Sequence, residues 1–144
     1  MGSCSYSSSV STFAQTITNL HVFVSSAGST LTANQNFGAL YDSSKNLLAQ
    51  TADQSTAWTS TGMKTMALSS AQAVAAGTIY VALWANATTR PTFRSSAVGS
   101  SSINGLLSAA NAIWATADTG ITTTAPSTLG AFSADTNARW VGVS

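Results

Sequence analysis

The chain has 144 residues, of which only 6% are charged, and it contains no glutamate. A typical soluble domain is about a quarter charged, whereas about half of this chain is serine, threonine or alanine. Its length fits one domain with a core of its own. The five basic residues are scattered and the net charge is +1, so we expect no basic surface for a nucleic acid.

No segment suits a membrane, so we expect no membrane partner. The longest apolar run covers residues 79–85, far short of the roughly 20 residues that a spanning helix needs. No charged segment leads into an apolar one near the N-terminus, so we expect no secretory signal. The single cysteine, Cys4, excludes an intrachain disulfide and a zinc site built from cysteines.

The first half of the chain predicts strands. Residues 1–16 are polar and serine-rich, which predicts an extended N-terminal arm or a first edge strand, followed by a single domain over 17–144. Residues 16–24 alternate between apolar and other side chains with β-branched residues among them, the pattern of a strand. Residues 36–51 hold two short apolar runs around a turn that Asp42 initiates, which predicts a β-hairpin.

Further strands are predicted in the second half. Residues 62–68 alternate again, and 71–76 suit either a helical turn or a loop. The near-continuous apolar run over 78–85 predicts a strand buried on both faces. Helical spacing over 103–114 indicates one short helix, with a loop and strand as the competing interpretation, and 138–143 predict a final strand.

Strands at this spacing, joined by turns of glycine, serine and asparagine, are typical of one architecture. We expect an all-β fold, an antiparallel β-sandwich of jelly-roll-like form.

The residues that carry most enzymatic chemistry are rare in this chain. His21 is the only histidine, and no Gly-x-Ser-x-Gly motif accompanies it. The four aspartates are scattered, with no spacing that suits a calcium loop or a carboxylate pair. We therefore expect no enzyme, no cofactor, no metal site and no catalytic residue, and a His21 that lies on a polar face or in an interface.

Four residues are candidates for contact with a ligand or a partner. Trp58 and Tyr41 flank predicted turns, where an exposed ring could stack on a sugar, and packing in the core is the competing interpretation for Trp58. Arg90 and Arg94 lie in a predicted loop over 86–94. Trp140 lies in an apolar stretch, which favours packing.

A series of segments carries a resemblance to a known family. They are ITNLHVFV (17–24), AGSTLTANQNF (27–37), GALYD (38–42), QTADQ (50–54), WTSTGMKT (58–65), GTIYVAL (77–83), ATADTG (115–120) and PSTLG (126–130). Together they resemble the β-sandwich domains of minor tail, fibre and other virion-surface proteins of tailed phages of actinobacteria. The resemblance covers residues 16–144 and includes no catalytic motif.

The resemblance implies a non-enzymatic structural protein on the surface of a virion, either a capsid decoration or a minor tail or fibre component. Its expected partners are copies of itself, in a trimer or another symmetric oligomer, and other virion proteins. The competing hypothesis is an adhesin that contacts a carbohydrate or receptor on the host surface. Low charge fits assembly, because the centres of protein interfaces are depleted of charged residues.

Overall fold

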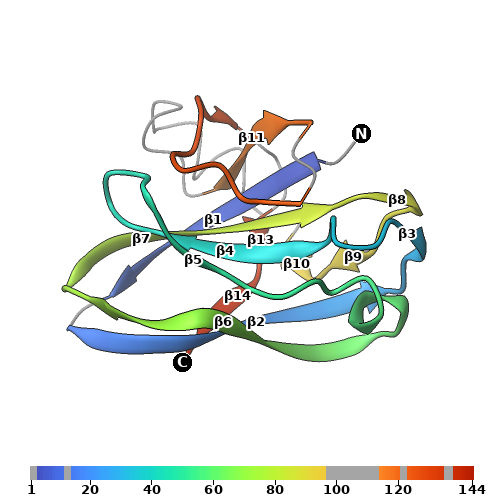
Figure 1. The fold of residues 1–144 in the computed structure, drawn as a ribbon, viewed down its shortest axis with the longest axis horizontal. Coiled ribbons are helices and arrows are strands. Elements are labelled where there is room, and N and C mark those ends of the chain that lie inside the picture. The colour runs from blue at the N-terminus through green and yellow to red at the C-terminus, as the bar shows by residue number, and fades with distance from the viewer. Residues whose placement is uncertain (1–2, 12–13, 97–113, 121–122, 135–137) are drawn as a thin grey trace.

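The computed structural model describes residues 3–11, 14–96, 114–120, 123–134 and 138–144. These residues form two layers of antiparallel strands, so the predicted all-β sandwich is confirmed (Figure 1). The strands are β1 (Ser3–Ser11), β2 (Gln15–Ser26), β3 (Ser29–Leu31), β4 (Phe37–Tyr41), β5 (Leu47–Gln50), β6 (Gly62–Val74), β7 (Gly77–Ala85), β8 (Ala87–Thr89), β9 (Thr92–Phe93), β10 (Ser95–Ser96), β11 (Trp114–Thr119), β12 (Ser133–Ala134), β13 (Ala138–Arg139) and β14 (Val141–Val143).

One layer is a six-stranded sheet in the order β12-β11-β1-β7-β4-β5. The other has the order β14-β2-β6, and β9 also pairs with β2. Two small sheets, β10-β13 and β3-β8, accompany the layers. A bridge between Thr51 and Leu68 joins the β5 side of the first layer to β6.

Strand β1 lies inside a sheet. It pairs with β7 from Ser3 opposite Ala85 to Ser11 opposite Gly77, and with β11 along its other edge. The chain is extended here, as expected, but the predicted edge position is wrong. Hydrogen bonding to β7 and β11 decides this position, and both strands lie far away in the sequence.

Strands β2 and β6 bury alternate side chains, as their patterns predict. Leu20, Val22 and Val24 of β2 point into the core, as does Met66 of β6. The register shifts between Ile17 and Asn19. Strand β6 continues to Val74, so the helical turn or loop predicted over 71–76 is wrong for 71–74, where Gln72, Ala73 and Val74 pair with the start of β2. Residues 75–76 form the predicted loop, which links β6 to β7.

The predicted hairpin is confirmed as β4 and β5. Its turn begins at Asp42, whose Oδ1 accepts hydrogen bonds from the backbone amides of Ser44 and Asn46, each at 2.8 Å. Lys45 has a positive φ of 69°, which such a tight turn requires. The aspartate therefore stabilises the turn from within.

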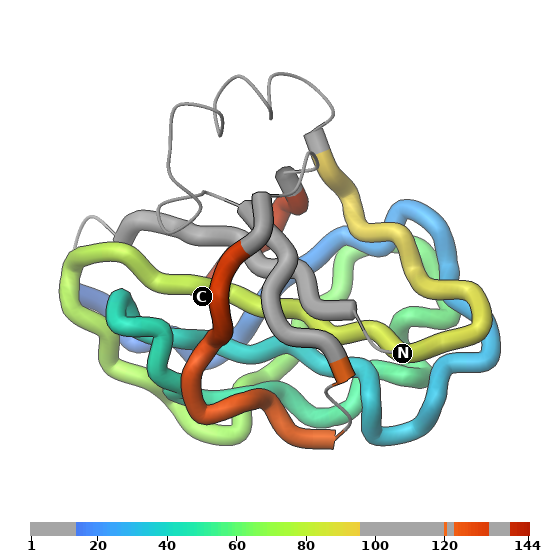
Figure 2. Tube along the Cα trace, turned by 90° about the horizontal axis from the view of Figure 1, so that it is seen from above, coloured from blue at the N-terminus to red at the C-terminus, as the bar shows by residue number. Residues whose placement is uncertain are grey.

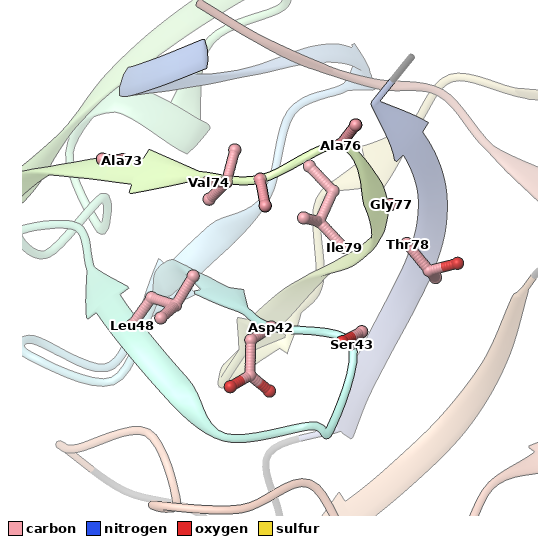
Figure 3. A pocket seen from close by; sticks show the side chains of 10 residues that line it. Asp42, Ser43, Leu48, Ala73, Val74, Ala76, Gly77, Thr78 and Ile79 are labelled. Atoms are coloured by element: carbon pink, nitrogen blue, oxygen red, sulfur yellow. The ribbon is translucent and has the colours of Figure 1, made fainter. Parts of the chain in front are cut away.

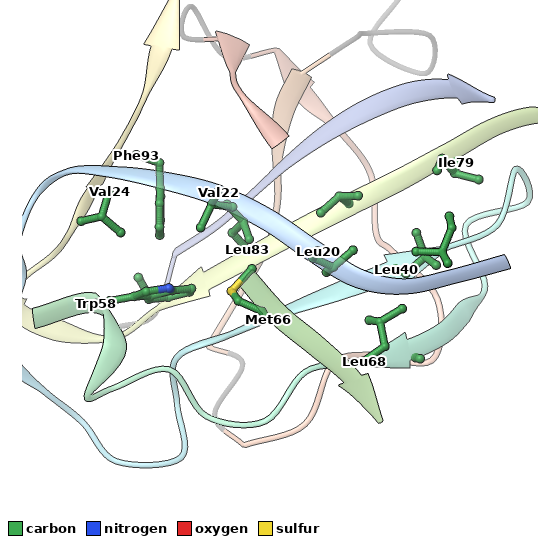
Figure 4. Packing of buried hydrophobic residues seen from close by; sticks show 14 of the residues in the cluster. Leu20, Val22, Val24, Leu40, Trp58, Met66, Leu68, Ile79, Leu83 and Phe93 are labelled. Carbon is green, nitrogen blue, oxygen red and sulfur yellow. The ribbon is translucent and has the colours of Figure 1, made fainter. Parts of the chain in front are cut away.

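Strand β7 is buried on both faces, as predicted, and its alternate residues enter two separate cores. Ile79, Val81 and Leu83 face the core between the sheets, which β2, β4 and β6 complete (Figure 4). Gly38 of β4 keeps the layers close, since a Cβ there would lie 3.0 Å from Leu20 Cδ1. Close packing of this kind leaves no room for a side chain.

The second core lies on the outer face of the six-stranded sheet. It consists of Phe37, Ala39, Tyr41, Tyr80, Ala82, Trp84, Ala125, Leu129 and Phe132. Residues 123–132, which contain no strand, cross this face and cover it (Figure 2). The Leu47 amide donates to the Ser127 carbonyl at 2.9 Å, and the Leu129 amide donates to the Lys45 carbonyl at 3.0 Å.

Three remaining predictions concern the C-terminal half. The short helix predicted near 103–114 lies outside the described residues except for Trp114, which begins β11. The predicted loop over 86–94 contains the short strands β8 and β9. The predicted final strand is two strands, β13 and β14, with Trp140 between them.

Candidate functional site

Two of the four predicted contact residues are buried. Trp58 lies in a 3-10 helix, Ala57–Thr59, with no exposed surface, and its ring meets Phe93 edge-on at 4.9 Å. Tyr41 is equally buried, and its hydroxyl donates to the Pro126 carbonyl at 3.0 Å. The hypothesis that these rings stack on a sugar is wrong, because both pack inside the fold.

The two arginines are exposed. Arg90 lies between β8 and β9, and Arg94 follows β9. The guanidinium of Arg94 lies 5.6 Å from the centre of the Phe23 ring, within the range of a cation–π contact. The structure therefore places Arg94 beside an aromatic ring that the sequence analysis did not select.

Phe23, Met63, Arg94 and Trp140 line one hollow of about 320 Å³ on the outer face of the β14-β2-β6 sheet. We call these four side chains the outer-face patch. Met63 is 55% exposed and Trp140 46% exposed, and they are the exposed large apolar side chains among the described residues. A cluster of exposed apolar side chains on a soluble protein often marks a binding surface.

Backbone pairing brings these four residues together. Phe23 of β2 lies opposite Met63 of β6. The Arg94 amide donates to the Phe23 carbonyl at 2.8 Å, and the Trp140 amide donates to the Arg94 carbonyl at 2.9 Å. The patch is therefore a row across neighbouring segments, built on hydrogen bonds that do not depend on its side chains.

A polar row borders the patch. His21 Nδ1 lies 3.1 Å from Thr65 Oγ1, and its Nε2 lies 2.9 Å from Ser144 Oγ. Gly142 lies between this row and the patch, because a Cβ there would be 3.5 Å from the Trp140 ring and 3.6 Å from His21 Cβ. His21 thus lies on a polar face, with both ring nitrogens beside hydroxyl groups.

The sequence analysis missed Trp140, Met63 and Phe23. The expected packing of Trp140 is wrong, since nearly half of its surface is exposed. The alternation in β2 and β6 did carry a signal, because it places Phe23 and Met63 opposite the buried residues. No local sequence pattern predicts that these two residues lie beside Arg94 and Trp140, because that contact depends on pairing between distant segments.

A second hollow, of about 180 Å³, lies at one end of the sandwich. It is bounded by the β4–β5 turn and by the link from β6 to β7 (Figure 3). Its lining is mostly alanine and aliphatic side chains, with Asp42 as the charged group. That carboxylate already accepts the turn amides, so this hollow offers little chemistry to a ligand.

Over the part of the chain that the structure describes, no three His, Cys, Asp or Glu side chains gather where they could hold a metal ion. In the same part, no helix combines the length and apolar character needed to cross a membrane. Comparison with protein-family models, curated proteins and solved structures finds no match to this chain.

Proposed function

We propose that this protein is a non-enzymatic structural component of the surface of a tailed phage particle, a capsid decoration or a minor tail or fibre protein. It assembles there with copies of itself, as a trimer or another symmetric oligomer, and with other virion proteins. The proposal starts from the resemblance of residues 16–144 to virion-surface sandwich domains. Its support in the structure comes from the exterior of one long strand.

That strand is β6, and the uncharged exterior of β6 carries the proposal. Beyond Met63 and Thr65, which line or border the outer-face patch, its exposed positions are Ala67, Ser69, Ser70, Ala71 and Ala73. None of these side chains is charged, so a neighbouring subunit could pack on them without desolvating an ion, which is a large cost in most interfaces. His21, the residue best suited to acid–base chemistry, lies between two hydroxyl groups instead of beside a carboxylate.

Charge placed on β6 tests this assembly. Ala67→Lys and Ala71→Lys should convert the oligomer to smaller species, because each would bury an unpaired ammonium in the contact. Thr89→Lys adds the same charge on exposed β8 and should leave the oligomer intact. Sedimentation measures the mass, and imaging of the particle locates the subunit. An unmodified chain that stays monomeric at all concentrations and is absent from particles would contradict the proposal.

The second candidate function is an adhesin that contacts the host cell surface. The outer-face patch favours it, because tryptophan and arginine are the side chains that most often dominate binding energy. Saturable binding of the pure protein to host cells is the expected result. If Trp140→Ala binds host cells as tightly as the unmodified protein, the adhesin contacts the cell through a surface other than this patch.

A further inference from the structure

We infer that the outer-face patch binds a uronic acid, a pyranose ring that carries a carboxylate, within a polysaccharide of a cell surface. The inference deepens the second candidate function and rests on it.

The charge of the face favours an anion. Strands β2, β6, β9 and β14 contain no acidic residue, whereas the exposed Arg94 lies in the patch. Cations with no nearby acid create a positive potential that attracts an anionic group.

Asp42 and Asp53 of a second copy of the chain are poor sources of that anion. Asp42 accepts the amides of its own turn, and Asp53 accepts the Asn36 amide and the Ser55 hydroxyl. A two-fold contact of the patch with itself would bring two Arg94 side chains together, and like charges repel. Both of these carboxylates thus already accept hydrogen bonds within their own chain, which favours an anion from another molecule.

The size of the patch favours a small ligand. A volume of about 320 Å³ lies at the lower end of the roughly 300–1,000 Å³ of ligand sites. The patch itself consists of only four side chains, whereas a stable protein partner buries about 800 Å² on each side. One sugar ring with its immediate neighbours fits this scale.

The side chains match the two faces of a sugar. The C–H face of a pyranose is apolar and packs on an indole or a thioether, which Trp140 and Met63 expose. Ring hydroxyls can reach the polar row of His21, Thr65 and Ser144 beside Gly142. The carboxylate pairs with the fork of N–H groups of Arg94, a charge-assisted contact with two parallel hydrogen bonds.

An array of uronic-acid oligosaccharides tests the inference. The probes are oligogalacturonate, alginate and hyaluronan fragments, each printed beside the same oligosaccharide with its carboxyl groups reduced to hydroxymethyl groups. A polyglutamate peptide of equal charge serves as an acidic control without a sugar ring. We expect at least one uronate to bind about tenfold more tightly than its reduced form, since a hydrogen bond to a charged group contributes at least that much.

Variants assign the binding to the patch. Trp140→Ala should weaken binding at least about tenfold, and Trp140→Tyr should restore part of it because a ring is present again. Arg94→Gln should abolish the preference for the acidic form and leave binding of the neutral form unchanged. Lys45→Gln is the matched control, since Lys45 is a cation that lies over the Phe132 ring in the covered core. Thermal unfolding confirms that each variant is folded.

Three results would overturn the inference. They are no binding to any uronate, equal binding to uronate and polyglutamate, and binding that Trp140→Ala leaves unchanged. If the protein binds host cells but binds no uronate, the uronate is rejected as the ligand and the adhesin function stands. If the protein binds neither host cells nor a uronate, the adhesin function is rejected as well. Neither result bears on the oligomer test with the β6 variants.

Discussion

The two outer faces of the sandwich carry aromatic side chains, but only one face is covered. On the six-stranded sheet, Tyr41 and Trp84 belong to the core that residues 123–132 cover, and both side chains are buried. On the β14-β2-β6 sheet, Met63 and Trp140 remain exposed. The chain thus covers the apolar side chains of one face with its own residues and leaves those of the other face exposed. Stability should therefore depend on the first face and binding on the second.

The largest effect is expected from Trp84→Ala. Trp84 is buried between Phe37 and Tyr41, with ring centres 5.3 and 6.4 Å away. The substitution should lower the free energy of unfolding by about 3–5 kcal/mol, because it leaves a large cavity. Urea unfolding measures this, with Trp140→Ala as the control at less than about 0.5 kcal/mol. Similar losses in both variants would show that the two faces do not differ.

Leu129→Ala should cost about 2–3 kcal/mol, because Leu129 is a buried side chain of the covering segment. The sheet itself should survive. Hydrogen exchange is then expected to accelerate in residues 123–132 and to stay slow in β2 and β6. Uniform acceleration across all strands would mean that the cover and the sandwich unfold as one unit.

Tyr41→Phe tests one hydrogen bond between the six-stranded sheet and the covering residues 123–132. It removes the hydrogen bond to the Pro126 carbonyl and keeps the packed ring, so a loss of about 1 kcal/mol is expected. Thermal unfolding monitored by circular dichroism can resolve a change of this size. An unchanged midpoint would assign the attachment of the cover to apolar packing alone.

The smallest effect is expected from the two cations. The Lys45 ammonium lies 3.7 Å from the centre of the Phe132 ring, closer than Arg94 lies to Phe23. Lys45→Gln should cost about 0.5–1 kcal/mol, and Arg94→Gln should cost less. Parallel urea titrations compare the two. A larger loss for Arg94→Gln would mean that the open face also contributes to folding.

Part of the candidate site was open to sequence reasoning. Arg94 was selected because it lies in a predicted loop, and alternation places Phe23 and Met63 on the outer side of their strands. Trp58 and Tyr41 were misjudged, because nearby turns suggest exposure while packing from distant segments buries both rings. Trp140 was misjudged in the opposite sense, because its apolar neighbours suggest packing.

The sequence by itself determined the all-β class, the β4–β5 hairpin and the buried β7, because alternation, turn residues and apolar runs act over a few neighbouring positions. Only the tertiary structure decided that β1 is an inner strand, that residues 123–132 cover one sheet and that Trp140 meets Arg94. These features depend on pairing between residues far apart in the chain, and no local pattern encodes which distant segment a strand will meet.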